Sequence, residues 1–117
     1  MAARLREQIE LGTVIAEREL LFQRPGEVAR PVCVRIGTPV EDTKHPGNAL
    51  CPMQVSGFEK DEKMVIGGVD TLQALVLALQ SAAAFVTACA RERGGTLTWL
   101  GGNDLGFPES SSSSKAP

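Results

Sequence analysis

The residues best suited to chemistry are three cysteines and a single histidine. Cys33, His45 and Cys51 could bind zinc, with Asp42 as a fourth ligand. Structural zinc sites usually contain pairs of ligands about two to four residues apart, and these residues form no such pair. We therefore expect no metal site and interpret Cys33 and Cys51 as small residues of strands.

A thiol enzyme would need a cysteine beside a histidine base. Cys89 falls in a predicted helix, where a packing role is the simpler interpretation, and His45 falls in a predicted loop. No two carboxylates stand out as an acid and base couple. We expect no enzyme, no catalytic residue and no cofactor, and keep a metal-dependent or thiol enzyme as the third hypothesis.

Two glycine-rich turns could in principle bind ions. Gly67 and Gly68 precede Asp70 at a predicted helix start, which could attract an anion, but the glycine spacing matches neither a P-loop nor a dinucleotide fingerprint. Asp70 is better explained as the N-cap of that helix. The run GGND at residues 101–104 lacks the repeated oxygen ligands of a calcium loop and predicts a turn.

The element that must position these residues is a long helix. Residues 71–90 contain no charge and no helix breaker, and they are mostly alanine and leucine. Gln73 stands where a capping-box partner belongs. Arg91 and Arg93 place positive charge at the expected C-terminus, and two glycines follow as a stop.

Short stretches of alternating apolar and polar residues predict a sheet. We expect strands over residues 13–23, 28–36, 50–58 and 63–69, a loop over 37–48, and a short last strand over 96–100. Arg18 falls on the apolar side of the first strand, a conflict that an exposed strand end would resolve. The order predicts an α+β fold: an antiparallel meander of about four strands with one long helix packed across one face, and a short C-terminal strand or tail.

The chain of 117 residues is expected to form a single domain over residues 13–108. Residues 1–12 are interpreted as an N-terminal extension, and residues 109–117 as a disordered Ser-rich tail. The net charge of −2 is well mixed, so a nucleic-acid partner is not expected. Three cysteines without close spacing and no signal peptide indicate the cytoplasm.

A membrane span is the alternative reading of the uncharged helix, since about 20 residues suffice to cross a bilayer. Polar residues within it and its alanine-rich composition argue against lipid. The polar residues are Gln73, Gln80, Ser81 and Thr87. We expect no membrane association.

Two apolar stripes run along the predicted helix. The first should lie on the sheet: Leu72, Leu75, Val76, Leu79, Ala83, Val86 and Ala90. The second is nearly opposite and should also be covered: Ala74, Leu77, Ala78, Ser81, Phe85 and Ala88. We expect residues 99–107 to fold back over this second stripe; a second copy or a foreign protein is the alternative. The candidate partner-binding residues are Leu77, Ser81, Phe85, Trp99, Asp104 and Phe107.

Three segments together resemble a family of small bacterial proteins of unknown function. They are CPMQVSG at residues 51–57, GVDTLQAL at 68–75 and WLGGNDLGFP at 99–108. The resemblance covers most of residues 13–108 and implies no established activity. Small bacterial α+β proteins of this kind sometimes look like immunity proteins encoded beside toxins.

The leading hypothesis is therefore a non-catalytic cytoplasmic interaction protein, with a toxin-neutralising immunity protein as its specific form. It rests on the lack of a catalytic constellation and on the excess apolar surface of the helix. The alternative is a small-ligand-binding domain, with a pocket between sheet and helix near Gly67, Gly68, Trp99 and Asp104.

Overall fold

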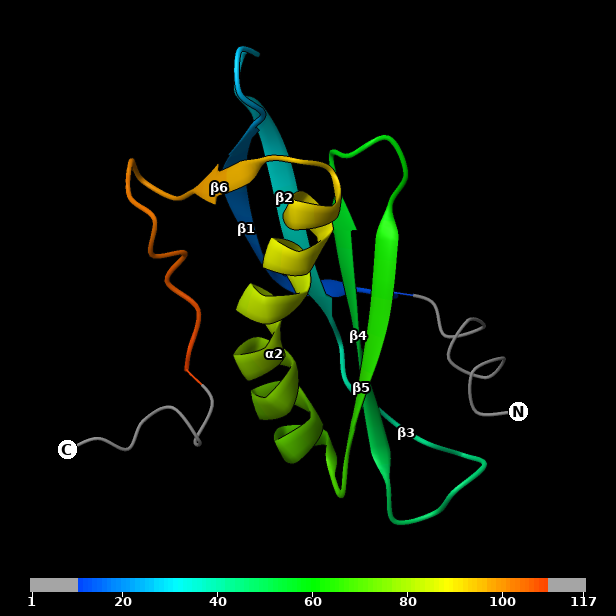
Figure 1. Ribbon diagram of the computed structural model, residues 1–117. Coiled ribbons are helices and arrows are strands. Elements are labelled where there is room, and N and C mark those ends of the chain that lie inside the picture. Colours follow the sequence, from blue (N-terminus) through cyan, green and yellow to red (C-terminus); the bar gives the residue numbers. More distant parts are fainter. Residues whose placement is uncertain (1–10, 110–117) are drawn as a thin grey trace, which may run out of the picture.

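The computed structural model describes residues 11–109, which form an antiparallel sheet with one long helix on one of its faces (Figure 1). In chain order the elements are β1 (Val14–Gln23), β2 (Arg30–Gly37), β3 (Val40–Glu41), β4 (Ala49–Ser56), β5 (Glu62–Gly68), α2 (Thr71–Glu92) and β6 (Thr96–Thr98). The predicted α+β fold is confirmed. The predicted extension and Ser-rich tail lie almost entirely outside the described residues.

The strands follow one another as a meander. β1 pairs with β2, β2 with β4, and β4 with β5, all antiparallel. After α2 crosses the sheet, β6 adds to the free side of β1 through Leu21 to Gln23. The short β3 was not expected inside the predicted loop; it pairs with β4 in line with β2, and two residues are too few to show an alternating pattern.

The core lies between the sheet and α2. Alternate residues of β1, β2 and β4 point to the helix side and are almost fully buried, as the period of two requires. They are Leu20, Phe22, Val32, Val34, Ile36, Cys51, Met53 and Val55. Phe58, just after β4, packs edge-on against Phe22 with ring centroids 5.0 Å apart.

The predicted caps of α2 are confirmed. The Asp70 carboxylate accepts a hydrogen bond of 2.8 Å from the Gln73 backbone N–H, and the Gln73 side chain accepts one of 2.8 Å from the backbone N–H of Val69. The first bond satisfies a donor that a helix start leaves free, and the second ties Val69, just before the cap, to the first turn. At the other end Gly94 has a φ of 76° and ends the helix, as a left-handed glycine typically does.

The orientation predicted for α2 is partly wrong. Its buried residues are Ala74, Ala78, Ala82, Val86, Cys89 and Ala90. Ala74 and Ala78 were expected on the far side, whereas Leu72 and Val76, expected on the sheet, are 69% and 41% exposed. A helix without charged residues gives no signal for its solvent side, and alanines allow the helix to lie close to the sheet.

The expected cover of α2 is also corrected by the structure. Residues 103–109 run beside the helix against β1, and no part of residues 11–109 covers the outward side of α2 (Figure 1). We call this side the outer face and define it by the exposed residues Leu72 and Val76 in the first half of the helix.

By length and composition, α2 is apolar enough to cross a membrane. One such helix is weak evidence, since the core helix of a soluble protein meets the same criteria. Here one side of α2 is buried against β4 and β5.

Candidate functional site

Arg18 of β1 is the anchor of the C-terminal segment. Its guanidinium carbon lies 3.8 Å from the centroid of the Trp99 ring and 5.2 Å from that of Phe107. Its Nη1 donates a hydrogen bond of 3.0 Å to the backbone oxygen of Leu105. The expectation that Arg18 lies at an exposed strand end is therefore wrong, because the two aromatic rings make its position on the apolar side favourable.

Gly106 lets the segment approach this stack. Its φ is +78°, and a β-carbon at this position would overlap the indole ring of Trp99. The backbone N–H of Gly106 donates to Asp104 Oδ1 at 2.9 Å, which fixes the bend just before it. Only glycine combines this backbone conformation with such close contact.

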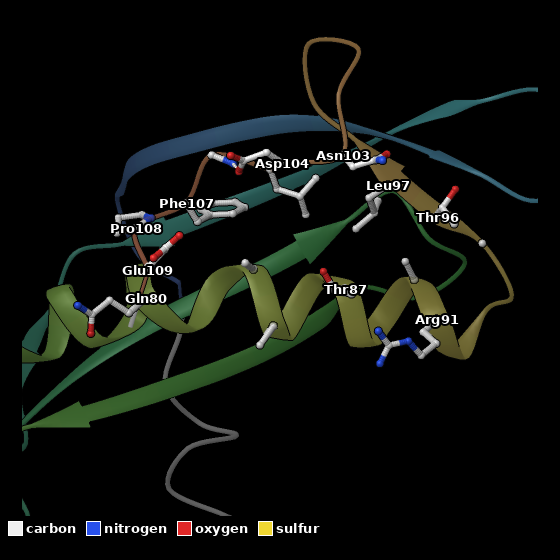
Figure 2. Close-up of a pocket in the computed structure, with 16 residues that line it drawn as sticks. Gln80, Thr87, Arg91, Thr96, Leu97, Asn103, Asp104, Phe107, Pro108 and Glu109 are labelled. Carbon is white, nitrogen blue, oxygen red and sulfur yellow. Dashed lines mark hydrogen bonds between the residues drawn. The ribbon is translucent and has the colours of Figure 1, made fainter. Parts of the chain in front are cut away.

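A cleft of about 1010 Å³ lies between the segment of residues 103–109 and α2 (Figure 2). Apolar groups of Ala83, Leu97 and Phe107 contribute to its walls. Its polar and charged residues are Gln80, Thr87, Arg91, Thr96, Asn103, Asp104 and Glu109. In Figure 2, Gln80 and Glu109 lie at one end, and Arg91 and Thr96 at the other. The cleft is therefore long and is lined by both apolar and polar groups.

A smaller hollow of about 290 Å³ lies on the β1 side of Phe107 and Pro108. Val34, Ile36 and Leu79 contribute apolar walls to it. Phe107 and Pro108 line both spaces, so they separate the hollow from the main cleft.

The six predicted partner-binding residues do not form a single surface. Asp104 and Phe107 line the cleft, and Trp99 lies behind it, stacked on Arg18. Leu77, Ser81 and Phe85 follow one another at intervals of four along another side of α2 and do not line the cleft; Phe85 packs against the core. Whether these residues bind a partner stays a prediction.

Residues 16–109 match a family described as a domain of unknown function, DUF6968. The chain belongs to the DUF6968 family. The match extends from β1 to the last described residue, so it includes both walls of the cleft. This agrees with the resemblance to a family of unknown function. Neither the curated proteins nor the solved structures contain a match to the chain.

The side chains considered for metal binding lie apart in this DUF6968 domain. His45 Nδ1 is 3.0 Å from Asp42 Oδ2 within their own loop. Burial alone would raise the pKa of Asp42, but hydrogen bonds from the Lys44 backbone and from His45 outweigh it and leave this pKa below its usual value. Over residues 11–109, no three His, Cys, Asp or Glu side chains lie close enough to hold a metal ion.

The cysteines of the DUF6968 domain are free and separated. Burial raises the pKa of Cys51 to about 11, and it also raises the pKa values of Cys33 and Cys89. A raised pKa lowers the thiolate fraction at neutral pH, and the thiolate is the reactive form. None of the three thus has the environment of an activated nucleophile.

Glu59 joins three parts of the DUF6968 fold near the C-terminus of α2. Its carboxylate is 3.0 Å from Arg24 Nη2 and 3.2 Å from Arg93 Nε, and Arg30 lies 3.9 Å away. Its own backbone N–H, Arg24 and Arg93 lower the pKa of Glu59 to about 2. Arg93 also contacts Glu62 at 2.7 Å. This cluster holds the turns to the helix end, and within it Arg30 Nη2 is buried without a hydrogen-bond partner in residues 11–109.

Sequence reasoning missed most of the cleft. Its long wall is the side of α2 that carries Gln80, Ala83 and Thr87. The sequence signal that could have located the cleft was Arg18, because a charged residue at an inward strand position needs partners. Aromatic residues are few in this chain, so they were the partners to consider.

Proposed function

We propose that this protein is a non-catalytic interaction protein that binds a protein partner through α2. The observation that carries the proposal is the outer face, where large apolar side chains are exposed in the first turns of a helix that has no charged residue from Thr71 to Ala90. Leu72 is 69% and Val76 41% exposed, and Val69 just before the helix is 63% exposed. Exposed apolar side chains that are continuous along a helix are typical of a docking surface.

These residues would supply one part of the free energy of binding. Full burial of a leucine or valine side chain contributes about 1.5–3 kcal/mol. Leu72 and Val76 are partly buried already, so together they would contribute roughly 2–3 kcal/mol on binding. The neighbouring cleft adds polar groups that can fix the orientation of a partner.

The specific form of the proposal is a toxin-neutralising immunity protein of a bacterial cytoplasm. An immunity protein acts by covering its toxin, so it needs an exposed surface and no catalytic residues. Three free cysteines, two of them buried, are compatible with a reducing compartment.

The experiment compares retrieval of partners from the native host by the wild type, Leu72→Glu and Val28→Glu. A glutamate at Leu72 lies in the first turn of α2, where the helix dipole favours it, so the fold should be kept. Val28 is 89% exposed outside the regular elements and is the matched control. We expect Leu72→Glu alone to lose the partner, and equal retrieval by all three proteins would refute the proposal.

The immunity form is tested by growth. Co-expression with the toxin encoded next to this chain should restore growth for the wild type and Val28→Glu, and not for Leu72→Glu. Rescue by none of them would leave a protein-binding role but remove the immunity role.

The cleft supports a second candidate, a domain that binds a small ligand. Its volume of about 1010 Å³ and its combination of apolar walls and polar groups are those of a ligand site. Trp99 fluorescence would report a metabolite that displaces residues 103–109. Thr87→Phe would narrow the cleft and should abolish such a signal; a ligand response that survives this change would exclude the cleft as the site.

A further inference from the structure

The outer edge of β5 is open. Of the residues in 11–109, only those of β4 pair with β5, so its other edge has no backbone partner along seven residues. An unpaired strand edge is a template for another strand. The edge forms one boundary of the sheet in Figure 1.

The helix lies close to the same edge. α2 packs over β4 and β5 (Figure 1). Neighbouring strands are about 4.8 Å apart. If the axis of α2 lies above the midline between β4 and β5, it is half a strand spacing from β5. A twofold axis between β5 and its copy is another half spacing beyond, so the helix axis lies about 5 Å from it. Two helices related by that axis would be about 10 Å apart, at the upper end of the range for packed helices.

The side of α2 that would face its copy is uncharged from Ala74 to Ala88 and carries Glu92 in the last turn. Gln80, Ala83 and Thr87 face the cleft, so the β5 side of the helix carries Leu77 and Ser81, with Ala88 further along. Near the dyad of a twofold interface a residue meets its own copy, and like charges there would repel. From Ala74 to Ala88 this side can therefore meet itself without an electrostatic penalty, and Glu92 lies about 16 Å along the helix from Ser81, away from the dyad.

The strand is also compatible with itself. In an antiparallel pair of β5 strands centred on Val65, Lys63 lies opposite Gly67 of the other copy and Glu62 opposite Gly68, so like charges are never directly opposite. The two ends of β5 are placed along α2 by their contacts: Gly68 lies beside the backbone of Ala74, and Glu62 pairs with Arg93. Val65, midway between them, is therefore level with the middle of α2, close to Ser81.

We propose that a second copy of this chain binds along β5. The two sheets then form one continuous antiparallel sheet, and the two α2 helices pack antiparallel across the dyad. This inference goes beyond the proposed function, because it concerns another side of α2 and the edge of β5. A helix of 22 residues is about 33 Å long, and the two layers together are about 20 Å high. The area buried on each copy would therefore be roughly 650 Å², near the ~800 Å² that each partner buries in a standard interface.

Ser81→Arg tests the arrangement, with Gln80→Arg as its matched control. Both add one arginine at consecutive positions of α2, but Gln80 faces the cleft. Sedimentation from low micromolar to near-millimolar concentration should give twice the 12.4 kDa of one chain for the wild type and Gln80→Arg. Ser81→Arg should raise the dissociation constant at least about 100-fold. Circular dichroism checks that both variants keep the fold.

A wild type that stays monomeric at every concentration would overturn this inference, and so would a dimer that is unaffected by Ser81→Arg. Neither result bears on the outer face, since Leu72→Glu tests partner binding on another side of the helix. Loss of the foreign partner by Leu72→Glu with an intact dimer would support both proposals. If the protein dimerises but no foreign partner is lost on Leu72→Glu, only the proposal of the dimer would stand.

Discussion

Replacement of Arg18 by methionine removes the guanidinium group and keeps most of the side-chain volume. The change removes the contact with Trp99 at 3.8 Å, the weaker one with Phe107 at 5.2 Å, and the hydrogen bond to Leu105. A cation–π contact of a half-buried arginine contributes about 0.5–1 kcal/mol, and a hydrogen bond from a charged donor about 1.5 kcal/mol. We expect the free energy of unfolding to fall by about 2–3 kcal/mol.

Urea denaturation followed by far-UV circular dichroism measures this loss. With a urea m-value of about 1.5 kcal/mol/M, the midpoint should fall by roughly 1.5–2 M. Trp99 is the only tryptophan, so its emission should shift to longer wavelength before any unfolding, as residues 103–109 leave the ring. Arg18→Lys, which keeps the charge without the planar group, should lose about half as much. A midpoint within about 0.3 M of wild type, with unchanged emission, would refute the role given to Arg18.

Three further predictions concern single side chains. Gly106→Ala should separate the segment from Trp99 and lower the free energy of unfolding by about 1–2 kcal/mol or more, measured by the same urea series. The folded pKa of Glu59 is about 2, below its unfolded value of about 4.3, so its contribution to stability is complete above about pH 5 and is lost as the pH falls toward 2. Glu59→Gln should therefore flatten the dependence of the thermal unfolding midpoint on pH between about 5 and 2. An unchanged slope would count against this role of Glu59. Cys51, with a pKa of about 11, should react with a thiol reagent at pH 8 only after unfolding, whereas half-buried Cys33 should react in the native protein. Rapid labelling of both cysteines in the native protein would contradict the burial of Cys51.

The elements of this fold were predictable because their signals are local. Asp70 with Gln73 marks the start of α2, and the glycines after Arg93 mark its end, so its bounds are correct to within about two residues. The four long strands follow from alternation of apolar residues, and each was located within one or two residues of its observed bounds.

The surfaces were less predictable because they depend on contacts between distant segments. The direction of α2 is set by its fit to β4 and β5, and the pattern of apolar residues does not distinguish Ala78, which is fully buried, from Val76, which is 41% exposed. Arg18 and Leu105 are 87 residues apart, so nothing local could pair them. The cleft follows from that pairing and was missed for the same reason.

The methyl groups of Ala74, Ala78 and Ala82 set the distance between the two layers of this fold, since all three are 0% exposed. One or two extra carbons at any of these positions would push α2 away from the sheet and change its tilt, because no neighbouring space can accommodate them. Freedom to vary is thereby confined to the parts of the helix that point away from the sheet. Substitutions on that side can therefore accumulate while the contact between helix and sheet stays the same.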